Sequence, residues 1–298
     1  MNDQMVIAED DAVEEFRREN QTKEIWRRFK KSKGSLVGLF LLVIILLLVI
    51  FANFITSYDL AIKQDPSKIL EAPSMEHPFG CDNYGRDVLA RTIHGGRISL
   101  GIAVLATLCS CVVGSLLGAV AGYFGGVIDS VIMRTLDIFM SVPDILFTMA
   151  IVVAFGSSFT VLLLALTVAF FTNYVRLVRS QVLNLSEQDY IEASRAGGAG
   201  NARIIFSHIL PNSIGVIIVN VTLNVAKIII YESTLSFLGL GMPPPQPDWG
   251  LMLSEAREFM RKAPFLMFFP GTAIVLCAVA VNFIGDGLRD ALDPHLKS

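Results

Sequence analysis

The chain has 298 residues, of which 53% are hydrophobic, and its mean hydropathy of +0.58 is well above that of a soluble domain. This composition excludes a purely soluble protein and indicates one that is largely embedded in a membrane. The formal net charge of −3 decides little, because the orientation of a membrane protein depends on where its lysines and arginines lie.

Six apolar runs recur along the chain, each about twenty residues long and therefore able to cross a hydrocarbon core about 30 Å thick. Only helices satisfy the backbone polar groups in lipid without closing a barrel. We therefore predict an all-α membrane protein whose six transmembrane helices lie near residues 36–55, 98–122, 131–155, 159–179, 213–238 and 266–288.

Positive charge gathers before the first apolar run, at Lys23, Arg27, Arg28, Lys30, Lys31 and Lys33. By the positive-inside rule this places the N-terminus in the cytoplasm, and six crossings return the C-terminus there. A cleaved signal peptide is disfavoured, since the run is long and no small-residue cleavage site follows. Residues 1–22 read as an acidic tail, and residues 23–33 as a basic interfacial helix with Trp26 and Phe29 facing lipid.

A turn-rich segment follows the first run and is expected on the outer side of the membrane. It contains the stretch His77-Pro-Phe-Gly-Cys-Asp-Asn-Tyr-Gly-Arg-Asp-Val-Leu-Ala-Arg91, in which Asp82 and Asp87 are candidate turn caps. His77, Cys81 and Asp82 offer metal-ligand atoms, but their spacing matches no known pattern, so no metal site is predicted. The other cysteines lie within apolar runs and predict no disulfide framework: Cys109, Cys111 and Cys277.

Glycine recurs every four residues along the second run, at Gly114, Gly118, Gly122 and Gly126. Such a strip lets another helix backbone approach closely, so we expect tight helix packing there. In the third run, Pro143 is predicted to kink or interrupt the helix.

A polar, glycine-broken segment, residues 186–212, separates the fourth and fifth runs. Ser186 and Asp189 have the spacing of a capping box, and Gly197-Gly198 would end the helix that they start. A second short helix is expected from Gly200-Asn201, carrying Ile204, Ile205, Phe206 and Ile209 until Leu210-Pro211 stops it. The resulting knob would expose apolar side chains where no lipid covers them, which favours a protein partner.

The fifth run is the most polar of the six, with Asn220, Asn224, Lys227, Glu232 and Ser233 in it. Ionisable groups in a membrane usually face a bundle interior or a water-filled cavity. Lys227 and Glu232 are a poor helical pair at their spacing. A proline-rich outer loop with Trp249 and a possible short helix at 254–262 follow.

These motifs resemble one family of membrane proteins. Glu192-Ala193, Gly198 and Ile209-Leu210-Pro211 resemble the coupling loop of ABC-importer permeases. The His77–Arg91 stretch resembles the HPxGTDxxGRDVLSR segment of C-type subunits in the dipeptide/oligopeptide/nickel family, with Cys81 where threonine is usual. Glu232–Gly241 resembles the ExSLSFLGLG stretch of that family, and Lys227 stands where a small residue is usual.

The resemblance implies the type I ABC importer permease fold, with a cytoplasmic coupling-helix loop. It divides the chain into an N-terminal tail and interfacial helix (1–35), a first transmembrane helix (36–55), an extracytoplasmic segment (56–97), a core permease domain (98–290, with the coupling loop at 186–212) and a C-terminal tail (291–298).

The implied function is that of a transmembrane permease subunit in an ATP-driven importer of di- and oligopeptides, in the cell membrane. Its implied partners are a homologous permease subunit, two ATP-binding subunits and an extracytoplasmic substrate-binding protein, together with the peptide and membrane lipid but no nucleic acid. No catalytic residue and no cofactor are expected in the chain, since ATP and Mg would bind the ATPase subunits.

Roles for particular residues follow from the resemblance in the coupling loop, from the polar residues and the proline within the spans, and from the expected outer position of two loops. Those expected to couple to the ATPase are Glu192, Ala193, Gly198, Ile204, Ile205, Phe206, Leu210 and Pro211. Those expected along the translocation pathway are Pro143, Asn220, Asn224, Lys227 and Glu232. Those expected to dock the binding protein are Asn83, Arg86, Asp87, Gln246 and Trp249.

Other functions are less well matched by the sequence. No Gly-x-x-x-x-Gly-Lys-[Ser/Thr] loop occurs, so the chain is not itself the ATPase. Import of nickel or a metal chelate is the alternative within the family. A secondary transporter is the alternative outside it, but that class favours inverted repeats, which the sequence does not display.

Overall fold

The computed structural model describes residues 23–292, in which all the regular structure is helical apart from one isolated bridge between Cys81 and Asp87. The tail predicted at 1–22 lies outside the described residues, as do residues 293–298 of the tail predicted at 291–298; residues 291 and 292 belong to α13. The α-helices are α2 (Lys33–Ile50), α3 (Ala52–Ile55), α4 (Tyr58–Ile62), α5 (Val88–Phe124), α6 (Gly126–Met140), α7 (Asp144–Phe155), α8 (Phe159–Ser186), α9 (Asp189–Ala196), α10 (Asn201–Arg203), α11 (Leu210–Phe237), α12 (Trp249–Ala256) and α13 (Phe265–Leu292).

The predicted all-α membrane fold is confirmed. Among the described residues, five helices are long and apolar enough to cross a membrane: α2, α5, α8, the helix from Asn201 to Phe237, and α13. The sixth candidate is the pair α6–α7, which is bent by 81°. Pro143 stands at the break, at the N-cap of α7, so the predicted interruption of this span is also confirmed.

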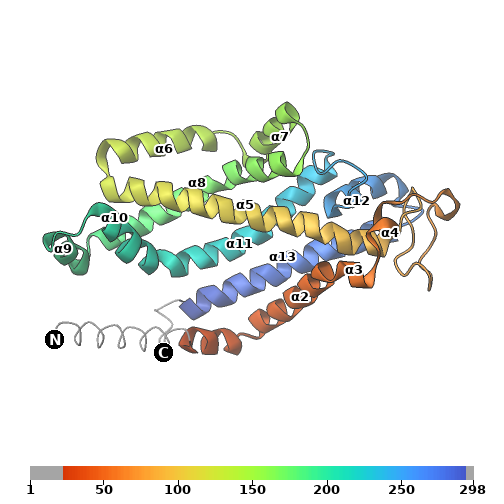
Figure 1. The fold of residues 1–298 in the computed structure, drawn as a ribbon, viewed down its shortest axis with the longest axis horizontal. Coiled ribbons are helices and arrows are strands. Elements are labelled where there is room, and N and C mark those ends of the chain that lie inside the picture. Colours follow the sequence, from red (N-terminus) through yellow and green to blue (C-terminus); the bar gives the residue numbers. More distant parts are fainter. Residues whose placement is uncertain (1–22, 293–298) are drawn as a thin grey trace.

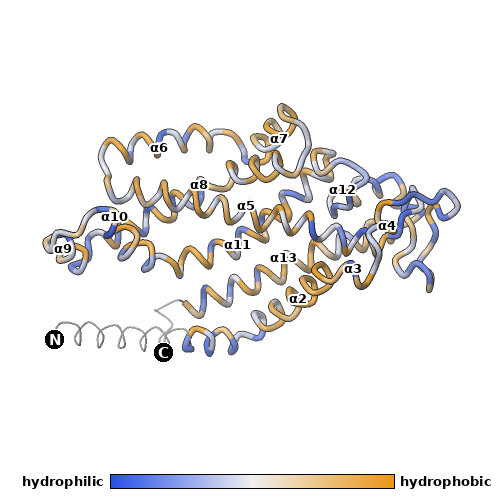
Figure 2. The backbone as a smooth tube through the Cα atoms, in the orientation of Figure 1, coloured by the Kyte–Doolittle hydropathy of each residue, from blue (hydrophilic) through white to orange (hydrophobic). Residues whose placement is uncertain are grey.

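The long helices run roughly along the longest axis of the molecule (Figure 1). Helix α5 packs against α8 and α11, and α2 pairs with α13. Helices α9 and α10 lie at one end of the bundle, whereas α4 and α12 lie at the other (Figure 1). Figure 2 shows hydrophobic residues along the shafts and hydrophilic residues gathered toward the two ends. The fold thus has one apolar belt and two polar ends.

Several helix boundaries differ from the prediction, and those of α5 and α12 bear on the site. Helix α5 starts at Val88 rather than near residue 98, because the Asp87 carboxylate caps it and accepts a bond of 2.7 Å from the Ala90 N–H. The first turns of α5 carry buried polar residues, which an apolar pattern does not detect. The short helix expected at 254–262 is α12, which begins at Trp249, and a 3₁₀ turn, Arg257–Phe259, follows it.

The interfacial helix before α2 is also placed differently from the expectation. Residues 23–31 are helical, and Trp26 stacks on Phe29 with ring centroids 5.7 Å apart. Phe29, however, is buried. Its ring lies beside Gly287 of α13, so it faces the protein rather than lipid. Trp26 stays half exposed, and its ring lies 4.9 Å from the Lys30 ammonium group.

The glycine strip of α5 packs directly on the backbone of α8. A Cβ atom added at Gly114 would lie 2.5 Å from the Phe171 carbonyl oxygen, and one at Gly118 would lie 2.5 Å from that of Val175. Gly122 is similarly close to α8, which confirms the predicted tight packing. Gly126 is not part of the strip, since it starts α6 with a positive φ of 52° and open space around it.

We predict that Gly118→Ala destabilises the protein, because the new methyl group has no space against the α8 backbone; overpacking of this kind costs about 1–3 kcal/mol. Gly101→Ala is the matched control, since it lies on the same helix with nothing within 4 Å of its added Cβ. Thermal unfolding of the detergent-solubilised chain measures both. Equal melting temperatures for the two variants would contradict the packing argument.

Candidate functional site

The 186–212 segment folds into a compact knob at one end of the bundle (Figure 1). Helix α9 ends at Ala196, and Gly198 adopts a left-handed conformation with φ of 82°, as expected of a glycine that ends a helix. Gly197 has an ordinary φ of −72°, so only Gly198 needs to be glycine for backbone reasons. The capping box is wrong: Ser186 is the last residue of α8, and Gln188 is the N-cap of α9 without a side-chain bond.

The predicted stop at Leu210-Pro211 is also wrong. The chain continues without a break from α10 through a π-helix, Ile204–Ile209, into α11. Pro211 lies in the first turn of α11, where a missing N–H is tolerated because the wider π-turn precedes it. The Asn212 side chain donates to the His208 carbonyl at 2.6 Å and Ser213 to that of Ile209 at 3.0 Å. These two side chains supply donors where the helical bonding is irregular.

The apolar residues of the knob divide into two groups. Ile204 and Ile205 are buried in the chain's own core, against Ile191 of α9 and Val178 of α8. This burial contradicts the expectation that they contact an ATPase directly; they fix the knob to α8 instead. Phe206 is 59% exposed, beside a groove of about 1140 Å³ between α5 and the start of α11. Leu210 is half-buried and Pro211 exposed at the same groove.

The outer surface of the knob is polar and open. Glu192 and Ala193 of α9 are exposed, as are Gly198 and the α10 residues. The Tyr123 hydroxyl at the end of α5 donates to the Asn201 side chain at 3.0 Å, and the Arg195 guanidinium lies 5.5 Å from the Tyr123 ring. The knob is thus held to α5 as well as to α8, while Glu192, Ala193 and Gly198 remain exposed on its outer surface.

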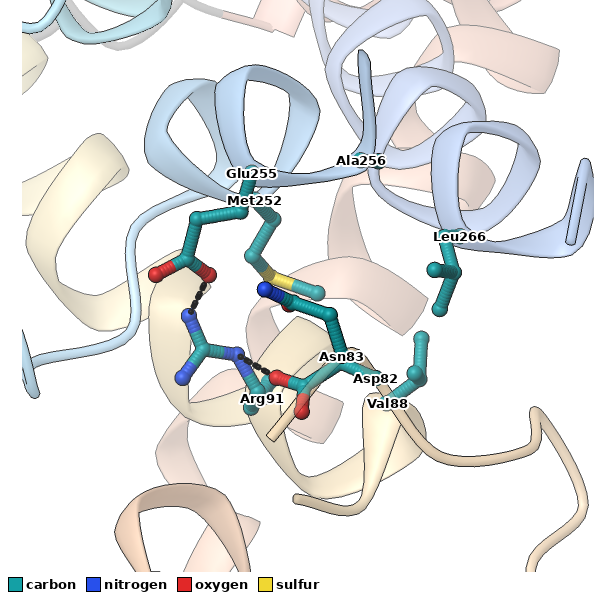
Figure 3. Close-up of a pocket in the computed structure, with 8 residues that line it drawn as sticks. All are labelled: Asp82, Asn83, Val88, Arg91, Met252, Glu255, Ala256 and Leu266. Carbon is teal, nitrogen blue, oxygen red and sulfur yellow. Dashed lines mark hydrogen bonds and ion pairs between the residues drawn. The ribbon is translucent and has the colours of Figure 1, made fainter. Parts of the chain in front are cut away.

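At the opposite end of the bundle, two arginines and two carboxylates form a buried network. Arg86 donates to Asp82 at 2.6 Å and to Glu255 at 2.7 Å. Arg91 donates to the same Glu255 oxygen at 2.9 Å and lies 3.4 Å from Asp82. Figure 3 shows Arg91 between Asp82 and Glu255, beside a small cavity that Met252 and Leu266 also line. The network ties the loop before α5 to α12.

A second set of contacts holds α12 in place. Asp248 caps α12 through the Gly250 N–H at 2.9 Å and accepts a bond of 2.6 Å from the Ser236 hydroxyl of α11. The Trp249 indole N–H donates to the Thr92 carbonyl of α5 at 2.7 Å. Ser236 also donates to Glu232 at 3.1 Å. Helices α5, α11 and α12 therefore meet in one polar cluster at this end.

Burial changes the interpretation of the predicted docking residues. Arg86, Asp87 and Trp249 are each less than 10% exposed and are committed to the contacts above, so none of them is available to touch a partner. Asn83 is half-buried and Gln246 is exposed. Arg86, Asp87 and Trp249 hold in place the loops that carry Asn83 and Gln246.

The predicted pathway residues are not brought together in one cavity. Pro143 and Lys227 are exposed, and Asn224 is buried. Asn220 lines a groove of about 550 Å³ between α11 and the end of α13. Glu232 is fully buried, and its bonds go to serines rather than to Lys227.

Sequence reasoning missed Glu255 and Asp248. Asp248 precedes the first residue of α12, so the preference of aspartate for N-caps was a usable signal. Glu255 had no such local signal, because its partners Arg86 and Arg91 lie 169 and 164 residues away in the sequence.

This fold, with a bent span and an exposed helical knob between two long spans, defines a polytopic membrane permease. Residues 114–298 match the family described as binding-protein-dependent transport system inner membrane component, and residues 20–73 match the N-terminal transmembrane domain of oligopeptide transport permease C. The chain belongs to the first of these families, the permease subunits of ABC importers.

Curated relatives cover nearly the whole chain. A dipeptide transport system permease protein, DppC, of Alkalihalophilus pseudofirmus is 44% identical over 93% of this chain and 90% of its own length. A glutathione transport system permease protein, GsiD, of Pectobacterium atrosepticum is 41% identical over 93% and 92%. An oligopeptide transport system permease protein, OppC, of Bacillus subtilis is 39% identical over 92% and 90%.

Among solved structures, the fold is similar to a chain of the MetNI methionine ABC transporter. The match has a TM-score of 0.52 and covers 68% of this chain and 97% of that one at 19% identity. At this identity the likeness shows the fold alone, and it is the importer permease fold expected from the sequence.

We predict that Glu255→Gln destabilises the chain by about 3 kcal/mol, because it leaves Arg86 and Arg91 buried with one carboxylate between them. Glu258→Gln, one turn further on and exposed, is the matched control and should be neutral. Thermal unfolding and protease resistance of the two variants in the same detergent measure the difference. A neutral Glu255→Gln would show that the network does not hold α12.

Proposed function

We propose that this chain forms half of the translocation pathway of an ATP-driven importer of short peptides. The observation that carries the proposal is the exposed α9 face of the knob, in a chain of the importer permease family. The substrate class is supported by the relatives, whose names specify dipeptides, oligopeptides and glutathione, which is itself a small peptide. On this proposal the chain provides the substrate with half of a path and performs no bond chemistry.

The ATPase partner would bind the outer surface of the knob. Glu192 and Ala193 are exposed on α9, and Gly198 follows them with nothing within 4 Å of a Cβ added to it. Ile204 and Ile205 are buried between α9 and α8 and would transmit a displacement of α9 to α8. Phe206, Leu210 and Pro211 lie on the groove side, where they suit a contact with a second permease better than one with the ATPase.

Movement would pass along rigid helices rather than through a chemical step. Two ATP-binding subunits, which hold ATP and Mg, would close and displace the knob. Since Tyr123 and Asn201 join the knob to α5, this displacement would tilt α5 and the elements packed on it. The permease then alternates between two openings whose populations the nucleotide biases.

The pathway would be completed by a homologous permease subunit. Lys227 is exposed on a membrane-spanning helix, where an ammonium group facing lipid is costly. A second subunit, or a water-filled path between the two subunits, would provide it with a polar environment. Asn220 and Pro143 are likewise accessible on the single chain, whereas Asn224 and Glu232 would have a structural role in this conformation.

The binding protein would dock at the end formed by α4, α12 and the loops around them. Asn83 and Gln246 are the accessible members of the predicted set, and the buried arginine network fixes the loops that carry them. The N-terminal positive charges support a cytoplasmic knob and an extracytoplasmic α12 end.

We predict that Gly198→Asp and, separately, Glu192→Lys abolish ATP-driven uptake of a labelled dipeptide by the complex reconstituted with its ATPase and binding-protein partners. A side chain at Gly198 meets the left-handed penalty of about 1–2 kcal/mol and intrudes on the partner surface. Glu192→Lys reverses the charge at one exposed position of that surface. Gly200→Ala is the control, because its φ of −69° suits any residue and its surroundings are open.

In the same experiment, binding-protein docking should survive in all three variants. Normal uptake by both Gly198→Asp and Glu192→Lys would show that this face does not receive the ATPase.

We predict that a membrane-impermeant maleimide labels Gln246→Cys in intact cells, and labels Ala193→Cys only after the membrane is opened. Both positions are exposed, so accessibility to the reagent depends on the side of the membrane alone. The background should have Cys109, the one exposed native cysteine among the described residues, replaced by serine. Labelling of Ala193→Cys in intact cells would mean that the orientation is inverted.

A further inference from the structure

Three residues with different metal-ligand groups meet in the loop before α5. A carboxylate oxygen of Glu71, a ring nitrogen of His77 and the sulfur of Cys81 all lie within 4.8 Å of one another. The backbone holds them there: the Cys81 N–H donates to the Glu71 carbonyl at 2.9 Å. Gly80, with φ of 75°, makes the turn that this contact needs. His77 and Cys81 are buried, and Glu71 is half-buried.

The His77 ring is oriented so that the lone pair of one nitrogen can bind a cation. Its Nδ1 lies 2.7 Å from the Asp87 carboxylate, which can only accept, so Nδ1 carries the hydrogen. Its Nε2 then has the lone pair. A histidine oriented by a carboxylate through its other nitrogen is the usual arrangement behind a metal-binding imidazole.

A cationic group already occupies the free side of this ring. The Lys68 ammonium nitrogen lies 2.9 Å from His77 Nε2 and 2.6 Å from a Glu76 oxygen. The same Glu76 oxygen is 3.7 Å from His77 Nε2. Lys68 also interacts electrostatically with Glu71 and Cys81. Positive charge is therefore favoured beside His77 and Glu76, within electrostatic reach of Glu71 and Cys81.

The Lys68 ammonium group can be displaced because its side chain lies near the surface. The Lys68 side chain is 30% exposed and that of Glu76 is 72% exposed, so both can swing out into solvent. By contrast, His77 and Cys81 cannot leave without unpacking the loop.

We propose that Glu71, His77 and Cys81 bind a divalent transition metal ion, zinc being the best match, in exchange for the Lys68 ammonium group. An oxygen, a nitrogen and a sulfur ligand together suit zinc and its neighbours rather than magnesium or calcium, which prefer oxygen alone. Glu76 is placed to be the fourth ligand. On binding, the Cys81 thiol releases its proton to solvent and the sulfur bonds the metal as a thiolate.

The metal would be linked to the transmembrane region through one residue. Asp87 holds His77 with one carboxylate oxygen and caps α5 with the other. In the sequence, Asp82 was the third potential ligand beside His77 and Cys81, but Asp82 is committed to Arg86. Glu71 takes its place, because the Gly80 turn brings residues 71 and 81 together.

The test is a cobalt titration of the full chain in lipid nanodiscs, purified without a histidine tag. Co²⁺ bound to a thiolate gives a sulfur-to-metal charge-transfer band in the near ultraviolet, and we expect that band in the wild type. Zn²⁺ should remove the band by competition, and Mg²⁺ should not. Lys68→Met removes a competing positive charge at about 3 Å and should tighten Co²⁺ binding by roughly tenfold or more.

Two cysteine variants identify the ligand. Cys81→Thr installs the residue usual at this position in the resembled family, so the loop should fold, and the band should disappear. Cys109→Ser removes the exposed cysteine and should leave the band unchanged. Glu71→Gln should weaken binding without abolishing it.

Four results would overturn the proposal. These are no charge-transfer band in either the wild type or Lys68→Met, a band that survives Cys81→Thr, a band that depends on Cys109, and Lys68→Met binding no tighter than the wild type. Because Lys68 is partly exposed and lies outside the core, its variant decides the question even if Cys81→Thr fails to fold.

Discussion

The backbone contact between α5 and α8 is the interaction on which the rest of the bundle depends. Lipid is as apolar as the side chains, so helices in a membrane associate through close packing and polar contacts rather than through the hydrophobic effect. The three glycines of α5 provide the close packing, and the Ser110 hydroxyl adds a bond of 3.0 Å to the Thr167 carbonyl. Two arginines of α8 then hold α6: Arg179 to Asp129, and Arg176 to Asp137 at 2.8 Å.

Helix α5 connects the two polar ends of the molecule in a single element of 37 residues. At its start, Arg91 and Thr92 hold α12; at its end, Tyr123 holds the knob. The helix contains no proline, the commonest cause of a sharp kink. A displacement of the knob would therefore reach the α12 end by tilting the helix as a rod, whereas α6 and α7 are separated by a bend of 81°.

The spans were predictable from sequence because hydropathy reports the environment of about twenty residues at once. The break at Pro143 and the left-handed Gly198 were predictable because each follows from the chemistry of one residue. The start of α5 was not, since Arg91 and His94 look solvent-exposed until Glu255 and the Thr56 carbonyl are known to lie against them. The burial of the predicted docking residues was not predictable for the same reason.

The prediction that the helix stops at Pro211 failed for a different reason. A proline normally predicts the end of a helix, but the π-turn before it absorbs the clash, and no local pattern announces a π-turn. The difference matters for function, because the segment expected to be a separate coupling helix is continuous with α11. Ile204 and Ile205 are then internal anchors, and the exposed surface of the knob is smaller and more polar than the sequence indicated.

Lys227 is exposed on the membrane-spanning helix α11. Within the described residues it forms no ion pair, and Glu232, the nearest carboxylate along the chain, is enclosed by Ser233, Ser236 and Asp248. Burial at the α12 end thus removes the one partner that the sequence offered. An ammonium group on a membrane-spanning helix still needs a polar neighbour or water. Within the described residues no carboxylate pairs with Lys227, and this is the observation behind the second subunit proposed above.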